Sequence, residues 1–209
     1  MKIYDLTLPI TGNDENAQVT PDHQFIKNGI TMSTLTLHSH YGTHMDAPLH
    51  FLLDGNTLDN MPLEKCLGPA IVCDLTHKSP DSFITVEDLH PWADRIGYGS
   101  RVLLRTDWSK RVNDPNFMTE FPRIHADCAQ WLADKGIWLI GIEHQSVAKL
   151  SSMQELTEVH HAFLKSEVVI VEGLANLRDL PQEDVMFSAL PLKIVGGDGI
   201  PCRAVAWVQ

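Results

Sequence analysis

Four of the eleven histidines in this 209-residue chain fall within thirteen residues, and one aspartate lies among them. The cluster comprises His38, His40, His44, Asp46 and His50. Two imidazoles and a carboxylate suit a divalent ion of intermediate softness such as Zn²⁺, or Mn²⁺ if further oxygen ligands join. We therefore predict a metal site built on His40, His44 and Asp46.

The predicted ligands leave room for catalysis. Three protein ligands leave a coordination position for water, whose pKa falls to about 7 on such an ion. A carboxylate has two oxygens, so Asp46 can bridge two ions. A histidine close to the ligands but not among them can move protons near neutral pH, and His50 is best placed for that role.

The backbone around these residues is predicted to be extended. His40 and His44 have the i, i+4 spacing of metal-binding helices, but Gly42, Thr43 and Pro48 make a helix unfavourable here. In an extended segment, alternate side chains share one face. The even-numbered residues of the cluster, with Thr34 and Thr36 before them, can therefore converge on one polar face.

Strand-like and helical patterns alternate along the chain. Apolar–polar alternation or short β-rich runs predict strands at 3–8, 31–37, 70–75, 101–106, 137–142, 168–171 and 203–208. Helices are predicted from Thr85 to Ile96, from Ile124 to Lys135 and from Glu155 to Lys165. Several strands lack a helix between them, so we expect a mixed α/β (α+β) domain with a central mixed sheet.

Length, net charge and cysteine content disfavour several kinds of domain organisation and binding partner. The length fits one domain spanning residues 1–209. The net charge of −11 disfavours nucleic acid and anionic membranes, and no apolar run approaches the roughly 20 residues of a membrane helix. None of the four cysteines forms a C-x-x-C pair, which disfavours an all-sulfur zinc site. With no secretion signal, these thiols predict a cytoplasmic protein.

Residues 40–51 resemble the H-x-G-T-H-x-D-x-P-x-H-F signature of the cyclase family of metal-dependent hydrolases, to which bacterial kynurenine formamidases belong. Other blocks of the family pattern follow in the expected order. They are 104–108, 159–164, 171–177, 191–194 and 198–204. The resemblance therefore covers most of the chain.

The resemblance implies a swivelling β/α/β-type fold, a homodimer or homotetramer, and one or two divalent ions, commonly zinc and sometimes manganese. It implies that His40, His44 and Asp46 hold one ion, that Asp46 bridges to a second ion completed by His160 and Glu172, and that His50 is the acid/base residue. The residues alone do not distinguish His160 from His161. Glu172 ends an apolar run, where a buried acid needs a partner.

The predicted reaction is hydrolysis of a carbon–nitrogen bond in a small amide, either a formamide such as an N-formylkynurenine-like arylformamide or a cyclic amide. Three segments depart from the family pattern. The stretch Val19–Asp22 lacks the aromatic residue expected before its proline, Asp107 stands where glycine is usual, and Glu143 stands where aspartate is usual.

Two other classes of protein remain open from the residues. A non-haem iron oxygenase uses two histidines and one carboxylate, and His44, Asp46 and His160 fit that set. Such enzymes usually have an all-β barrel, which the predicted helices disfavour. The other class is a non-catalytic metal-binding protein, although structural zinc sites normally close with four protein ligands.

Overall fold

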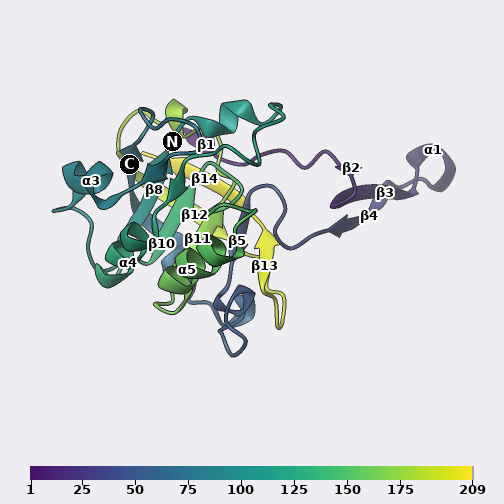
Figure 1. Cartoon of the computed structure of the whole chain (residues 1–209). Coiled ribbons are helices and arrows are strands. Elements are labelled where there is room, and N and C mark those ends of the chain that lie inside the picture. Colours follow the sequence, from purple (N-terminus) through teal and green to yellow (C-terminus); the bar gives the residue numbers. More distant parts are fainter. Residues whose placement is uncertain (209) are drawn as a thin grey trace.

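A nine-stranded mixed sheet forms the body of the computed structural model, which describes residues 1–208 and the side chains of all of these except 13 and 14. The strand order is β1-β14-β12-β6-β8-β10-β11-β5-β13 (Figure 1). The strands are β1 (Ile3–Asp5), β5 (His44–Asp46), β6 (Leu67–Asp74), β8 (Arg101–Arg105), β10 (Leu139–Ile142), β11 (Val169–Glu172), β12 (Asp184–Leu190), β13 (Gly199–Pro201) and β14 (Arg203–Trp207).

The four central strands β6, β8, β10 and β11 are parallel, and the strands on either side of them pair antiparallel. Parallel strands are normally buried on both faces and are therefore almost wholly apolar. β10 shows this pattern, because all four of its residues are buried. The mixed central sheet predicted from the sequence is confirmed.

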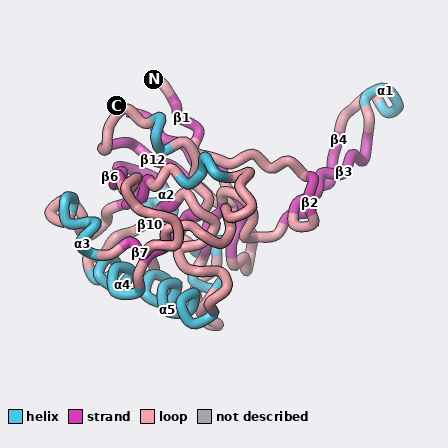
Figure 2. Tube along the Cα trace, turned by 45° about the horizontal axis from the view of Figure 1, so that its top comes forward, coloured by secondary structure: helices cyan, strands magenta, loops and turns pink. Residues whose placement is uncertain are grey.

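Helices α3 (Val86–Leu89), α4 (Ala126–Asp134) and α5 (Met153–Leu164) pack on one side of this sheet, as the tube view shows (Figure 2). Two further short helices, α1 (Phe25–Asn28) and α2 (Leu63–Cys66), lie elsewhere, and Cys66 of α2 belongs to the core on the opposite face. Short 3-10 turns lie at Pro48–His50 (η1), Leu58–Asn60, His90–Trp92, Trp108–Arg111 and Leu177–Asp179. A separate two-stranded sheet joins β7 (Phe83–Ile84) to β9 (Arg123–Ile124). Within residues 1–208, no helix combines the length and the apolar character that crossing a membrane requires.

Two of the three predicted helices are confirmed with small shifts at their ends. α5 begins two residues earlier than expected because the Ser152 side chain caps it, accepting from the Glu155 amide. The helix predicted from Thr85 to Ile96 is wrong beyond Leu89. Its capping box between Thr85 and Asp88 is present, but the α-helix ends before Pro91, whose missing N–H cannot continue the hydrogen-bond ladder.

The alternating side chains of the central strands fill two apolar cores. Val102, Leu104 and Ile140 point toward the helices, while Leu103 and Leu139 point to the opposite face. The second core also receives residues from both ends of the strand order, such as Met45 and Ala206, so the sheet curves around it. The central strands therefore form a rigid platform beside the histidine cluster.

A three-stranded arm projects from this body (Figures 1 and 2). It consists of β2 (Asn13–Asp14), β3 (Ala17–His23) and β4 (Met32–Leu37), with the short helix α1 between β3 and β4. The predicted strand at 31–37 is therefore confirmed. Thr34 and Thr36 belong to the arm and are exposed, so the expectation that they share a polar face with the metal ligands is wrong.

Candidate metal centre

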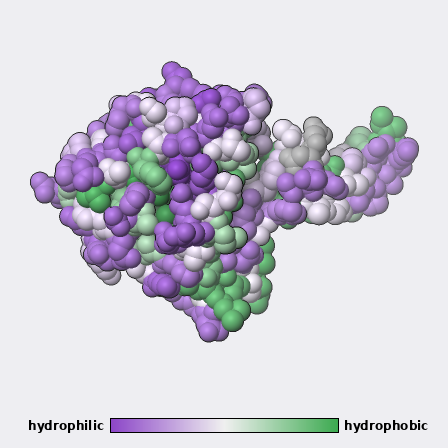
Figure 3. Space-filling model, in the orientation of Figure 1, coloured by the Kyte–Doolittle hydropathy of each residue, from purple (hydrophilic) through white to green (hydrophobic). Residues whose placement is uncertain are grey.

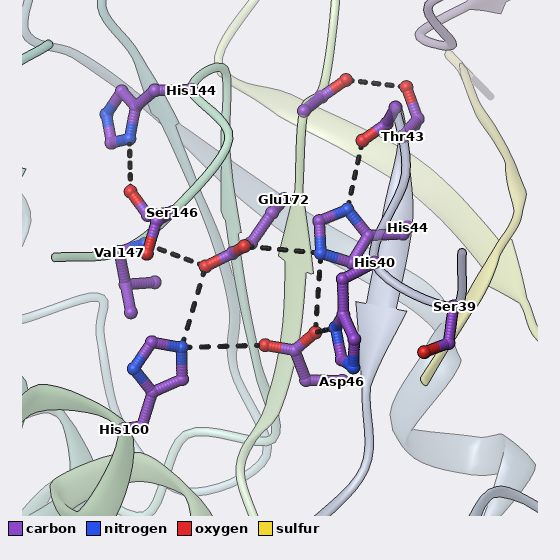
Figure 4. A network of polar contacts seen from close by, with 12 residues as sticks. Ser39, His40, Thr43, His44, Asp46, His144, Ser146, Val147, His160 and Glu172 are labelled. Atoms are coloured by element: carbon purple, nitrogen blue, oxygen red, sulfur yellow. Dashed lines mark hydrogen bonds and ion pairs between the residues drawn. The ribbon is translucent and has the colours of Figure 1, made fainter. Parts of the chain in front are cut away.

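Strand β5 carries the two most buried histidine-cluster residues, His44 and Asp46, on one face. β5 lies between β11 and β13, and His44 is directly opposite Glu172 of β11 in the register. The His44 Nε2 atom lies 3.3 Å from Glu172 Oε2 and 3.5 Å from Asp46 Oδ1 (Figure 4). Strand pairing therefore brings together two residues that are far apart in the sequence.

His160 reaches the same cluster from helix α5. Its Nε2 atom lies 3.7 Å from Asp46 Oδ2 and 3.9 Å from Glu172 Oε1. Its Nδ1–H donates to the Leu156 carbonyl at 2.7 Å, so Nε2 is the nitrogen left for an ion. The neighbouring His161 instead contacts the Phe51 carbonyl, so the structure separates the two histidines that the sequence could not distinguish.

His40 lies at the outer side of the cluster and is 22% exposed. Its Nδ1 atom is 2.8 Å from Asp46 Oδ1, and its Nε2 atom is 2.9 Å from Asp198 Oδ2. The turn that follows contains Gly42 with φ of 62°, a backbone conformation that glycine adopts without strain. As expected, the chain between His40 and His44 is a turn leading into a strand and not a helix.

His50 ends the turn η1 and stacks on the His40 ring, with 3.7 Å between ring centroids. Nitrogen and oxygen atoms of His40, Asp46 and His50 all lie within 4.8 Å of one another. This geometry allows His50 to act on protons beside an ion or to bind the ion directly. Its assignment as the acid/base residue stays a prediction.

The donor set fits divalent ions. A second group of ligand atoms, from His44, Asp46 and Glu172, also lies within 4.8 Å and shares Asp46 with the first group. Asp46 is fully buried, yet its Oδ2 atom has no hydrogen-bond partner among the described residues. An unpaired buried carboxylate oxygen is energetically costly, and a cation would satisfy it. Imidazole and carboxylate together are the donors that zinc and manganese accept.

The pKa values of His40 and His50 are shifted in opposite directions. Burial disfavours the charged form of His40, but its hydrogen bonds and charge interactions with Asp46 and Asp198 outweigh this effect and raise its pKa to about 9. Burial and the neighbouring imidazoles of His40 and His160 lower the pKa of His50 to about 4. Burial and the nearby Asp46 raise the pKa of Glu172. Without an ion, His40 is thus protonated at neutral pH while His50 is neutral.

A cavity of about 700 Å³ opens beside His40. Most of its wall surface is apolar, and polar side chains and two histidines of the cluster interrupt it. The apolar side chains are Leu8, Pro9, Val112, Phe117 and Met118, the polar ones include Thr11, Asn113 and Gln145, and the histidines are His38 and His40. His38 therefore faces the cavity but belongs to neither group of ligand atoms in the described chain. The cavity gives a small molecule access to the cluster.

Two departures from the family pattern have structural explanations. Asp107 has a positive φ of 58°, which explains why glycine suits this position. Glu143 is fully buried and accepts hydrogen bonds from the Thr106 amide and the Ser109 hydroxyl, both at 2.8 Å. These contacts anchor the loop after β8. The third departure, Val19–Asp22, lies in arm strand β3 and contributes nothing to the lining of the cavity.

Sequence reasoning gave no role to Asp198, although it lies within a recognised block. Asp198 contacts both His40 and Ser39, at 2.9 and 3.2 Å. An acid directly before a glycine at the start of a strand is the only sequence signal for it, and that signal is weak. His144 was also missed; it is fully buried, and burial lowers its pKa to about 4.

Solved structures are similar to this protein in fold and in sequence. One described as "predicted metal-dependent hydrolase from Bacillus stearothermophilus" is 33% identical, with a TM-score of 0.80 over 98% of this chain and 97% of that chain. Isatin hydrolase A from Ralstonia solanacearum is 26% identical, with a TM-score of 0.85 over 100% of this chain and 92% of that chain. Fold and site together define a metal-dependent hydrolase.

Sequence comparison gives the family. A kynurenine formamidase from Salinibacter ruber (strain DSM 13855 / M31) is 36% identical over 179 residues, which is 86% of this chain and 81% of the relative. Residues 4–149 match the Cyclase family model, described as "Putative cyclase". The chain belongs to the Cyclase family, as the histidine motif predicted.

Proposed function

We propose that this protein hydrolyses the carbon–nitrogen bond of a small amide, either an arylformamide or a cyclic amide. The observation that carries the proposal is the buried cluster of imidazoles and carboxylates around Asp46, next to a mainly apolar cavity. The similarity to a kynurenine formamidase and to an isatin hydrolase supports both substrate types. The apolar walls favour an amide that carries an aromatic or aliphatic ring.

Metal binding in this proposal uses five residues: His40, His44, Asp46, His160 and Glu172. We favour zinc, with manganese as the alternative, because the donor set mixes imidazole nitrogen and carboxylate oxygen. Asp46 belongs to two groups of close ligand atoms, one with His40 and the proton-transfer residue His50, the other with His44 and Glu172, and this supports two ions per chain over one. Bound ions of this kind supply Lewis acidity and an acidified water.

His50 is proposed to transfer the proton. Its ring is neutral at pH 7, so Nδ1 or Nε2 has a lone pair that can accept a proton from the attacking water. The water oxygen then bonds to the carbonyl carbon, and the carbon–nitrogen bond breaks. His50 hands its proton to the leaving nitrogen, which yields a carboxylic acid and an amine. His50 stacks on His40, which holds its ring beside the cluster.

The test combines metal content with turnover. Protein purified without chelator or nickel is analysed by inductively coupled plasma mass spectrometry and assayed on arylformamides and fused-ring cyclic amides. We expect about two equivalents of zinc in the wild type, and a loss of turnover of about 10²- to 10⁴-fold in His50→Gln. His161→Gln is the matched control, because its ring faces the Phe51 carbonyl, and it should retain activity.

Four results would contradict parts of this proposal. No bound metal after reconstitution would contradict the metal site. Loss of one zinc equivalent in His50→Gln would make His50 a ligand and not a proton-transfer residue. Unchanged turnover in His50→Gln would remove its catalytic role, and no turnover of any amide would favour the non-catalytic alternative.

The oxygenase alternative finds no support in the structure or the comparisons. Helices α4 and α5 cover a mixed sheet, which is not the all-β barrel expected of that class. Glu172 adds a second carboxylate to the ligand set. The similar proteins described above are hydrolases.

We also propose that the protein works as a homodimer or homotetramer, held together through the arm. Val19 and Leu35 pair across β3 and β4 and are 42% and 62% exposed. Phe25 and Ile26 of α1 are 69% and 98% exposed, and the surface view shows apolar surface at the arm tip (Figure 3). A small sheet needs a buried apolar face for stability, and a second copy of the chain would provide one.

We propose a single domain over 1–209, because β1 and β14 bring both ends of the described chain into one sheet. We propose a cytoplasmic location, because all four cysteines are buried and unpaired in the described chain. We also propose a fold of the swivelling β/α/β type, which superposition on members of that type would test.

A further inference from the structure

Asp198 directly precedes β13, the strand that pairs with the ligand-bearing strand β5. β13 pairs with β5, and Gly199 is opposite Asp46 in the register. The Asp198 carbonyl also accepts a hydrogen bond from the Ala47 amide at 2.8 Å. The backbone of residues 198 and 199 is therefore fixed relative to Asp46.

The three histidines nearest Asp46 are oriented in two different ways. His44 donates Nδ1–H to the Gly42 carbonyl at 3.0 Å, and His160 donates Nδ1–H to the Leu156 carbonyl at 2.7 Å. Both turn Nε2 toward the carboxylates. His40 uses the opposite arrangement, with Nδ1 toward Asp46 and Nε2 toward a side chain, that of Asp198.

His40 also lacks the burial that fixes the other two rings, since its side chain is 22% exposed while theirs are 2% exposed. When an ion takes Nδ1, the Asp198 carboxylate, 2.9 Å from Nε2, would accept the proton that the ring keeps. The Ser39 hydroxyl donates to the same Asp198 oxygen at 3.2 Å, which restrains the carboxylate.

Gly199 provides the space for this arrangement. A Cβ atom at residue 199 would overlap His40 Cε1 and lie 2.8 Å from His40 Nε2. The imidazole therefore packs against bare backbone, and any side chain at residue 199 would force the ring out of its present position.

We propose that Asp198 and Gly199 are positioning residues for His40. Asp198 accepts the Nε2–H hydrogen bond and so keeps the Nδ1 lone pair facing Asp46, where an ion would be held, while Gly199 admits the ring. The inference rests on the proposed metal-dependent function and adds to its five ligands a pair of residues that do not bind the ion. A carboxylate behind a ligating histidine typically changes metal affinity by about 10- to 100-fold.

The first experiment measures zinc affinity by competition with a chromophoric chelator. We expect Asp198→Ala to weaken the binding of one zinc equivalent by about 10- to 100-fold. Asp198→Asn should lose less, because its amide oxygen still accepts the hydrogen bond. Asp179→Asn, an exposed aspartate elsewhere, is the control and should bind as the wild type does.

A second pair of variants tests the packing. Gly199→Ala should weaken the same zinc equivalent, whereas Gly97→Ala, where an added Cβ meets nothing within 4 Å, should not. Circular dichroism identifies any variant that fails to fold. If Gly199→Ala does not fold, the zinc affinities of the Asp198 variants still decide the test.

The second experiment reads the ring protons directly by long-range ¹H–¹⁵N correlation spectra of ¹⁵N-histidine-labelled, zinc-loaded protein. The signal absent from His40→Ala identifies His40. The wild type should carry its proton on Nε2, and Asp198→Ala should change that signal.

Equal zinc affinity and an unchanged His40 signal in Asp198→Ala would overturn the inference while leaving the proposed function intact. Absence of zinc binding by the wild type would contradict the proposed function itself, and the inference with it.

Discussion

His40 and His50 stack with 3.7 Å between their ring centroids, but the two imidazoles hold their protons differently. His40 lies between the carboxylates of Asp46 and Asp198, which raise its pKa to about 9. At His50, burial together with the neighbouring imidazoles outweighs the charges of the same two carboxylates and lowers the pKa to about 4. A metal ion must therefore displace a proton from His40 when it binds, whereas His50 is already neutral at pH 7.

The lowered pKa of His50 predicts how the stability of the metal-free protein depends on pH. The unfolded chain protonates this histidine near pH 6.5, but the folded chain does so only near pH 4. The folded state thus binds fewer protons between these values, and its stability falls as pH drops from about 6.5 to about 4. His50→Gln should reduce this loss by about 1–2 kcal/mol, a figure lowered for solvent screening at a partly exposed ring.

Urea unfolding of the metal-free protein at pH 4.5 and pH 7 measures this effect. His144 also has a pKa of about 4 and contributes in the same direction, so His50→Gln should flatten the pH dependence without abolishing it. His161→Gln serves as the comparison. An identical pH dependence in wild type and His50→Gln would show that His50 does not titrate as described.

Part of the site could be predicted from the sequence because it is local. His44 and Asp46 alternate along one short segment, and extended backbone puts them on one face. His160 could not be separated from His161, because the choice depends on how α5 is rotated against the sheet. Asp198 reaches His40 only through the pairing of β13 with β5, which no local pattern specifies.

At the scale of elements, the end of β11 is locked to the turn before β5. Gly173 has a φ of 66°, and its amide donates to the His144 carbonyl at 2.8 Å. Its own carbonyl accepts from the Thr43 hydroxyl at 2.5 Å. This contact fixes Glu172 relative to His44.

Gly173→Ala should disturb both stability and metal binding. An added Cβ would overlap the Gly42 carbonyl oxygen and lie 2.7 Å from Gln145 Nε2, and the positive φ adds strain. We expect a loss of about 2–4 kcal/mol in the free energy of unfolding, measured by urea denaturation, with weaker zinc binding. Gly97→Ala is the control. A stable Gly173→Ala protein with full zinc content would show that this turn does not position Glu172.

Elements with a repeated pattern were predicted well, whereas short or interrupted ones were not. α4 and α5 carry apolar residues at helical spacing and side-chain caps, and both were found. β12 was missed although Val185, Phe187 and Ala189 are buried at alternate positions, because Met186 between them obscures the alternation. β13 has only three residues and exists through its pairing with β5.

At the scale of the whole molecule, the arm has an apolar face that stays exposed in a single chain. Its apolar face carries Val19 and Leu35, while Gln18 and Thr36 form a cross-strand pair on the other face. If the apolar face packs against a second copy, Val19→Ser with Leu35→Ser should shift the protein toward the monomer. Gln18→Ser with Thr36→Ser should leave the oligomer unchanged.

Size-exclusion chromatography with multi-angle light scattering over a range of protein concentrations measures the outcome. We expect the apolar-face double variant to raise the dissociation constant at least about 10-fold, which corresponds to about 1.4 kcal/mol. A wild type that is monomeric at all concentrations would contradict the proposed oligomer. Equal behaviour of the two double variants would place the interface away from this face.

The position of β5 between β11 and β13 also bears on how the chain reaches its native state. Both partners of this three-residue strand come from segments more than a hundred residues later in the chain. Loops of that length must close before His44 and Asp46 meet Glu172, and such long-range pairing slows folding. During synthesis, the complete ligand set is available only after Glu172 has left the ribosome, and β5 gains its second partner only with residues 199–201. A nascent chain therefore carries the histidine motif long before the site is complete.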